Sequence, residues 1–113
     1  MKLYRMIIGD DERVILDSLM KYVDWKSLGF EVVALVEDGK EAIDILRAEK
    51  IDVVLCDIMM HEVSGLDVAE YISNENLACE IVLLSGYQDF DYARRAISYN
   101  VDVVVNPFCN ISD

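Results

Sequence analysis

The sequence predicts an α/β fold in which helices join the parallel strands of a single sheet. Five short apolar runs recur along the 113 residues and show little polar alternation, which is typical of strands buried on both faces. The segments between these runs carry apolar residues at helical spacing. Strand and helix thus alternate along the chain and end on a strand. This alternation favours parallel strands joined by right-handed helical crossovers.

The expected strands are the apolar runs themselves, which are Met6–Ile8, Val32–Val36, Val53–Cys56, Ile81–Leu84 and Val103–Val105. Each expected helix is marked by apolar residues that share one face: Ile15, Leu19 and Val23; Ala42, Ile43 and Leu46; Leu66, Ala69 and Ile72; and Phe90, Ala93 and Ile97. Asp38 and Gly39 open the second helix, and Asn74 and Asn76 help to close the third.

Acidic residues dominate the charge, with 22 Asp and Glu against 10 Lys and Arg and a formal net charge of −12. Because nucleic acids and anionic membranes bind basic surfaces, this charge argues against either as a ligand of these residues. A content of 54% hydrophobic residues excludes a disordered acidic tail, and the length predicts one domain over residues 1–113. No apolar run approaches the roughly 18 residues of a membrane span. We expect no membrane association.

The three cysteines are odd in number and none forms a CxxC pair. Cys56 lies in an apolar run, where a reduced cysteine packs as a small hydrophobic residue. This usage favours a reducing cytoplasm, without a disulfide or a zinc site.

Polar side chains follow the expected strands at their carboxyl ends, where open α/β sheets bind ligands. They are Asp10, Asp11 and Glu12 after the first strand, Asp57 after the third, Ser85 and Gly86 after the fourth, and Asn106 and Pro107 after the fifth. Helix capping accounts for one Asp in each loop. It accounts poorly for an acidic triplet beside a further acid, because close like charges raise one another's pKa. A hard divalent cation such as Mg²⁺ would resolve that conflict.

Two further acidic positions have simpler interpretations. Glu37 and Asp38, after the second strand, are interpreted as ordinary cap and loop residues. Glu12 is interpreted as an acid in the first helical turn, where the helix dipole favours a negative charge.

Four motifs occur in order: Asp10-Asp11-Glu12, Asp57-Ile58-Met59-Met60 with Gly65 eight positions after Asp57, Ser85-Gly86-Tyr87, and Asn106-Pro107-Phe108. Together they resemble the receiver domain of two-component response regulators, over essentially the whole chain. Residues 24–33 and 85–90 further resemble receivers joined to an AraC-type helix-turn-helix region. The resemblance implies a flavodoxin-like, doubly wound parallel sheet of five strands in the order 2-1-3-4-5. It also implies that the fifth helix is largely absent from this chain and that an effector domain follows residue 113.

The resemblance also assigns roles to residues. Asp57 would be the phosphoacceptor, receiving a phosphoryl group from a sensor histidine kinase or a small phosphodonor. Mg²⁺ or Mn²⁺ would be held by Asp10, Asp11, Asp57 and the backbone carbonyl of Met59. The phosphoryl group would be bound by Ser85, Gly86 and Asn106, and Pro107 would shape the adjoining turn. Such a domain is a cytoplasmic signalling module and not a classical enzyme. Its output would be transcriptional, it would contact DNA only through another domain, and it could form a homodimer.

Three positions depart from the family pattern. Asn106 replaces a Lys whose charge pairs with the acidic cluster and the phosphoryl group, a role that a neutral amide cannot match. His61 replaces a Pro and is interpreted as a solvated loop residue, and Val103 replaces the aromatic residue that responds to phosphorylation. A degenerate receiver, acting as an interaction module without phosphorylation, therefore remains an alternative.

An enzyme is the second alternative. Phosphatases of the haloacid dehalogenase type also use an Asp nucleophile and Mg²⁺, but they carry Asp-x-Asp directly after the first strand. Here Asp10 and Asp11 lack the intervening residue, and Asp57 is followed by Ile58 and Met59. A flavodoxin-type electron carrier is disfavoured because the first strand leads into acids and not into a phosphate-binding loop.

Overall fold

The structure, a computed structural model, describes residues 2–60, 62–85 and 102–105. Its elements follow the predicted alternation: β1 (Tyr4–Gly9), α1 (Arg13–Tyr22), β2 (Phe30–Val36), α2 (Gly39–Ala48), β3 (Val53–Asp57), α3 (Gly65–Asn74), β4 (Glu80–Ser85) and β5 (Asp102–Val105). The helix expected around Phe90, Ala93 and Ile97, and the expected loss of the fifth helix, lie outside the described residues.

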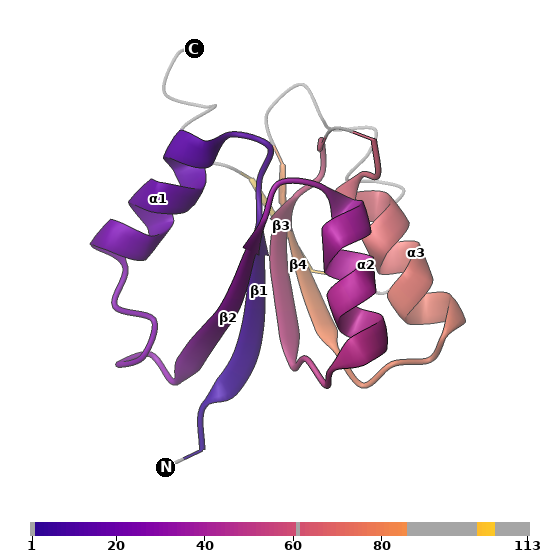
Figure 1. Ribbon diagram of the computed structural model, residues 1–113, viewed down its shortest axis with the longest axis horizontal. Coiled ribbons are helices and arrows are strands. Elements are labelled where there is room, and N and C mark those ends of the chain that lie inside the picture. The colour runs from indigo at the N-terminus through magenta and orange to yellow at the C-terminus, as the bar shows by residue number, and fades with distance from the viewer. Residues whose placement is uncertain (1, 61, 86–101, 106–113) are drawn as a thin grey trace.

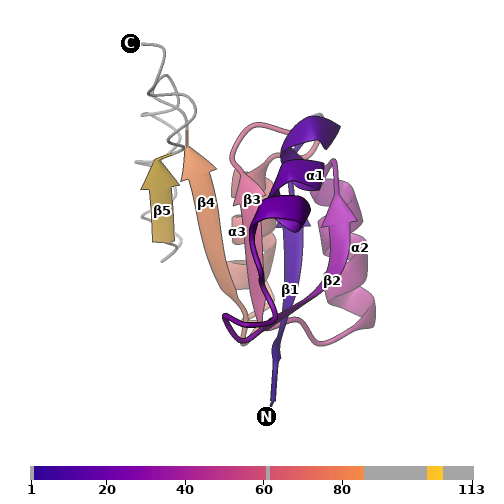
Figure 2. The same ribbon diagram turned by 90° about the vertical axis from the view of Figure 1, so that its left-hand side faces the viewer.

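The strands form one parallel sheet in the order β2-β1-β3-β4-β5, which confirms the predicted order. The chain runs outward from β1 to β2, then crosses back to β3 on the other side of β1, so the order reverses between β1 and β3. The sheet is the middle layer of three. α1 covers one face, and α2 and α3 lie side by side on the other (Figures 1 and 2).

The core has one part on each face of the sheet, which explains why the strands read as unbroken apolar runs. Ile7 belongs to the larger cluster, under α2 and α3, whereas its neighbour Ile8 packs with Leu16 of α1 in the smaller one. Both isoleucines are fully buried. Cys56 is also fully buried in the larger cluster, as predicted, and burial raises the pKa of its thiol above the usual range.

The helix ends largely follow the predicted signals. Asp38 caps α2 by accepting the backbone N–H of Lys40 at 2.9 Å. α3 begins with a capping box between Ser64 and Asp67 that the sequence analysis did not identify. The interpretation of Glu12 as a first-turn acid is wrong, because helical geometry starts one residue later. Glu12 is the N-cap of α1, and its side chain makes no capping hydrogen bond.

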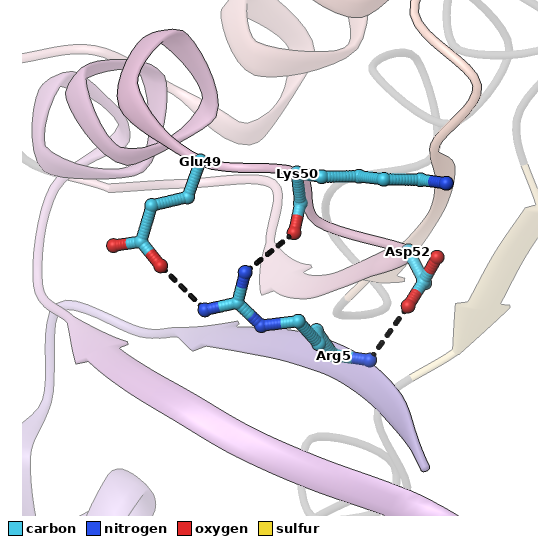
Figure 3. Close-up of polar contacts among 4 residues, drawn as sticks. All are labelled: Arg5, Glu49, Lys50 and Asp52. Atoms are coloured by element: carbon cyan, nitrogen blue, oxygen red, sulfur yellow. Dashed lines mark hydrogen bonds and ion pairs between the residues drawn. The ribbon is translucent and has the colours of Figure 1, made fainter. Parts of the chain in front are cut away.

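Arg5 ties the amino-terminal ends of β1 and β3 together (Figure 3). Its backbone N–H donates to Asp52 Oδ2 at 2.8 Å, and its Nη1 donates to the Lys50 carbonyl at 3.0 Å. Its Nη2 pairs with the Glu49 carboxylate. These contacts fix the entry of β3 beside β1, and from there the register runs from Met6 opposite Val53 to Gly9 opposite Cys56.

None of the helices in the described ranges combines the length and the apolar character that a membrane span requires.

Candidate functional site

The pairing of β1 with β3 brings the predicted acids together at the carboxyl edge of the sheet. Gly9 lies opposite Cys56, so the chain leaves the two strands at Asp10 and Asp57 side by side. Asp10, Asp11 and Asp57 each offer a carboxylate oxygen, and these oxygens lie within 4.8 Å of one another. Asp10 and Asp11 are adjacent in sequence, and Asp57 follows them by 47 and 46 residues. The fold nevertheless brings the three side chains into one cluster, at the point where the strand order reverses.

Asp10 is the buried member of this cluster, with 3% of its surface exposed. Its backbone N–H donates to the Val36 carbonyl at 3.0 Å, which attaches it to the end of β2. Its Oδ1 accepts the backbone N–H of Glu12 at 2.9 Å. The pKa of Asp10 is raised to about 6, first by burial and then by the neighbouring Asp11, against the lowering effect of the Glu12 N–H. The free carboxylate cluster is thus electrostatically unfavourable.

Asp57, the last residue of β3, is half-buried and accessible from solvent. The backbone N–H of Met59 donates to its Oδ1 at 3.3 Å. Ile58 and Met60 on either side of Met59 are buried, whereas the Met59 side chain is exposed. The Met59 backbone is therefore held beside the Asp57 carboxylate while its side chain points away from the core.

Backbone hydrogen bonds hold both ends of the loop that follows β3. The Ile58 N–H donates to the Leu84 carbonyl at 3.2 Å, and the Ile58 carbonyl accepts the Gly65 N–H at 2.8 Å. A Cβ at Gly65 would lie 2.5 Å from the Asp57 carbonyl oxygen. Only glycine allows α3 to start this close to the end of β3, which explains the Gly65 of the sequence motif.

Asp38 is a residue whose wider contacts the sequence analysis missed. Its predicted role as a cap is correct, but its carboxylate also accepts backbone N–H groups from Glu62 and Val63 in the loop that follows Asp57. The available signal was its place at the carboxyl end of β2, at the same edge as the other acids.

The remaining predicted site residues are placed only in part. Ser85 is the last residue of β4, where its backbone pairs with Val105 at the same edge of the sheet. Val103 lies within β5, opposite Leu83. His61, Gly86, Asn106 and Pro107 lie outside the described residues.

The donor set fits a hard divalent cation. Carboxylate oxygens are the preferred ligands of Mg²⁺ and Mn²⁺, and three are close together here. A cation would also offset the repulsion that burial and Asp11 impose on the Asp10 carboxylate.

Comparisons with known proteins agree with this arrangement. A family model described as the response regulator receiver domain matches residues 6–110. The transcriptional regulatory protein HptR of Staphylococcus aureus is 30% identical over 106 residues, which are 93% of this chain and 41% of HptR. The transcriptional regulatory protein YesN of Bacillus subtilis is 30% identical over 108 residues, 96% of this chain and 29% of YesN. The chain thus spans less than half the length of these relatives.

Solved structures share the fold. The receiver domain of AraT, a response regulator from Geobacillus stearothermophilus, has a TM-score of 0.83 at 32% identity, covering 93% of this chain and 82% of that one. A two-component transcriptional regulator AraC from Clostridium phytofermentans has a TM-score of 0.81 at 30% identity, covering 92% and 81%. The latter agrees with the AraC-type likeness seen in the sequence. With a family model matched from β1 past β5 and an acidic edge in the expected place, the chain belongs to the response regulator receiver domains of two-component systems.

Proposed function

We propose that this domain accepts a phosphoryl group on Asp57 and relays its phosphorylation state to a transcriptional output. The observation that carries the proposal is the cluster of Asp57 with Asp10 and Asp11, whose carboxylate oxygens lie within 4.8 Å of one another at the carboxyl edge of the sheet. Membership of the receiver family supports this proposal, and so do relatives named as transcriptional regulators.

Asp57 is better suited to be the nucleophile than Asp10, and the resemblance to receiver domains assigns this role to Asp57 and not to Asp11. Asp10 is buried, its Oδ1 is engaged by the Glu12 N–H, and its raised pKa leaves part of the population protonated near pH 6. Asp57 is half-buried at the end of β3. In the proposed reaction an oxygen of Asp57 bonds to phosphorus while the bond from phosphorus to the donor breaks, and the product is an acyl phosphate on Asp57.

Asp10, Asp11 and Asp57 would hold Mg²⁺ or Mn²⁺. The resemblance to receiver domains adds the carbonyl of Met59, whose N–H donates to Asp57. When bound, such a cation would neutralise phosphoryl oxygens and help to align the attacking Asp57 oxygen with the leaving group of the donor. Ser85 and Gly86, after β4, and Asn106, after β5, would bind the phosphoryl group, and Pro107 would shape the turn that follows.

The proposed partner is a sensor histidine kinase in the cytoplasm. DNA would be contacted through a domain outside this chain, because the net charge of −12 opposes direct binding by these residues. The relatives contain more than twice the length of this chain, which leaves room for such an output domain in proteins of this kind.

Intact-mass measurement after incubation with acetyl phosphate tests the proposal. Wild-type protein should gain one phosphoryl group with Mg²⁺ present and none with EDTA, and Asp57→Asn should gain none. Asp44→Asn, which removes an exposed acid of α2, is the matched control and should be labelled like wild type. Equal labelling of Asp57→Asn would show that another residue accepts the group.

The same measurement decides the alternatives. A folded domain that binds Mg²⁺ but gains no phosphoryl group would be a degenerate receiver, which the replacements at Asn106, His61 and Val103 favour. The haloacid dehalogenase hypothesis has lost its support, because the matched family is a signalling family and the motif after β1 is Asp10-Asp11.

A further inference from the structure

We propose that Asp38 is a positioning residue for phosphoryl transfer, because it holds the loop that carries Met59 beside Asp57. The inference rests on the proposed function, in which the Met59 carbonyl is a ligand of the divalent cation. Asp38 itself would touch neither the cation nor the phosphoryl group. It would act through the described residues of the β3–α3 loop, 58–60 and 62–64.

The Asp38 carboxylate joins two segments that are distant in sequence. Its Oδ1 accepts the backbone N–H of Lys40 at 2.9 Å and that of Val63 at 3.1 Å, and its Oδ2 accepts the N–H of Glu62 at 3.0 Å. The bond to Lys40 is the ordinary N-cap of α2. The other two span 24 and 25 residues and serve no capping purpose.

The backbone of Gly39 strengthens the same junction. Its N–H donates to the Val63 carbonyl at 2.9 Å. Val63 therefore makes two hydrogen bonds with the start of α2: its carbonyl accepts from Gly39, and its N–H donates to Asp38. A Cβ at Gly39 would lie 2.5 Å from that carbonyl oxygen and 2.9 Å from Val68 Cγ2. The loop therefore lies directly against the first turn of α2.

The contacts of Asp38 and Gly39 with Glu62 and Val63 restrain the middle of the loop, between its two ends. Bonds of Ile58 and Gly65 close the two ends of the loop. Between them, the backbone N–H of the exposed Met59 donates to Asp57 Oδ1 at the long distance of 3.3 Å. Asp38 restrains the chain three and four residues after Met59. Without it, the Met59 backbone would stay beside Asp57 for a smaller fraction of the time.

The expected effect follows from that fraction. A ligand's apparent dissociation constant rises in inverse proportion to the population of the binding-competent state. If the competent loop falls to between a third and a tenth of the population, the Kd for Mg²⁺ rises by about threefold to tenfold. Labelling of Asp57 at saturating Mg²⁺ should change much less, since the bound cation restores the competent loop.

Three variants of the 113-residue chain separate positioning from capping. Ser is a good N-cap but too short to reach the loop, so Asp38→Ser should keep the stability of α2 and still lose Mg²⁺ affinity threefold to tenfold. Asp38→Ala should lose both. Asp38→Asn keeps an oxygen for Lys40 and Val63 but replaces the acceptor of the Glu62 N–H by an NH2 donor, so it should recover only part of the affinity that Asp38→Ala loses.

Two measurements provide the readout: Mg²⁺ affinity by titration calorimetry, and amide hydrogen exchange at Glu62 and Val63 in metal-free protein. Asp38→Ser and Asp38→Ala should accelerate exchange at both amides. Asp24→Ser is the matched control, because Asp24 accepts the N–H of Ser27 in the remote α1–β2 loop. It should change neither readout.

The proposal is overturned if Asp38→Ser binds Mg²⁺ like wild type, whether or not exchange accelerates, since the loop would then not limit binding. It is also overturned if Asp38→Asn loses as much affinity as Asp38→Ala while amide exchange at Val63 stays as slow as in wild type, which would assign the effect to charge. Failure of the proposed function is distinguishable, because in that case wild-type protein itself would bind no Mg²⁺ or gain no phosphoryl group on Asp57.

Discussion

Replacing Asp10 by Asn should stabilise the metal-free domain at neutral pH by as much as about 3 kcal/mol. Burial raises the pKa of Asp10 from 3.8 to about 6, whereas in the unfolded chain the carboxyl ionises normally. One pKa unit corresponds to about 1.4 kcal/mol, so holding the ionised carboxylate in the fold costs about 3 kcal/mol. Asn has nearly the same shape and keeps an oxygen for the Glu12 N–H, so it removes the charge without removing that hydrogen bond.

The stabilisation by Asp10→Asn should increase with pH. Below the unfolded pKa of 3.8, Asp10 is protonated in both states and imposes no cost. Between there and about 6 the folded protein keeps a proton that the unfolded chain releases, so the stability of the wild type falls as pH rises. Above about 6 the cost is complete. The free-energy difference between Asp10→Asn and wild type should therefore be near zero at pH 3.5 and largest at pH 7 to 8.

Urea unfolding in EDTA across that pH range is the assay. Asp44→Asn, which removes an equal charge from the exposed surface of α2, is the control for net charge and should give a small difference with little pH dependence. Mg²⁺ should also raise the midpoint of Asp10→Asn less than that of wild type. A stabilisation of Asp10→Asn that is absent at pH 8, or equal at pH 3.5 and pH 8, would refute the reasoning from burial.

Two further substitutions test the packing at the two ends of β3. Gly65→Ala places a methyl group 2.5 Å from the Asp57 carbonyl oxygen, and should lower the free energy of unfolding in urea by about 1–3 kcal/mol. Ser73→Ala, at an exposed position of the same helix, is the control. An equal loss of stability in the two variants would show that α3 can shift freely. Arg5→Ala removes the side-chain contacts to Glu49 and to the Lys50 carbonyl, both on the surface, and should cost about 1 kcal/mol in the same assay. Arg5→Lys should recover only part of that loss, because Lys cannot donate to both partners in a fixed fork; full recovery would argue that charge alone matters.

In the described part of the chain, the alternation of strands and helices could be predicted because few local signals conflicted, whereas the strand order came from the resemblance to receiver domains. Ile7 and Ile8 are adjacent in sequence, yet their side chains are buried on opposite faces of the sheet. Two consecutive large apolar residues are favourable in a strand only when both faces of the sheet are covered. The acidic cluster followed from the same logic. Once β1 and β3 are neighbours, the residues after Gly9 and Cys56 must meet at one edge.

The contacts of Asp38 could not be predicted in this way. Its bonds to Glu62 and Val63 depend on the path of an irregular loop, for which the sequence has no periodicity to read. Glu12 was wrongly placed in the first turn of α1 for a related reason. Both Asp10 and Glu12 are acceptable near a helix start, and the structure uses the Asp10 carboxylate to accept the Glu12 N–H before the helix begins.

The energetic cost of the acidic cluster is of a size that this fold can sustain. Burying one large aliphatic side chain stabilises a protein by about 1.5–3 kcal/mol, so the cost of about 3 kcal/mol at Asp10 corresponds to one or two of the fully buried residues beneath it, such as Ile7 and Ile8. A ligand at a hundred times its Kd contributes about 2.7 kcal/mol by mass action. Bound Mg²⁺ would therefore offset nearly the whole cost, at a place where the register of β1 and β3 already brings Asp10 and Asp57 together. The strain is confined to the edge of the sheet where the proposed chemistry occurs, while Arg5 secures the register from the opposite edge.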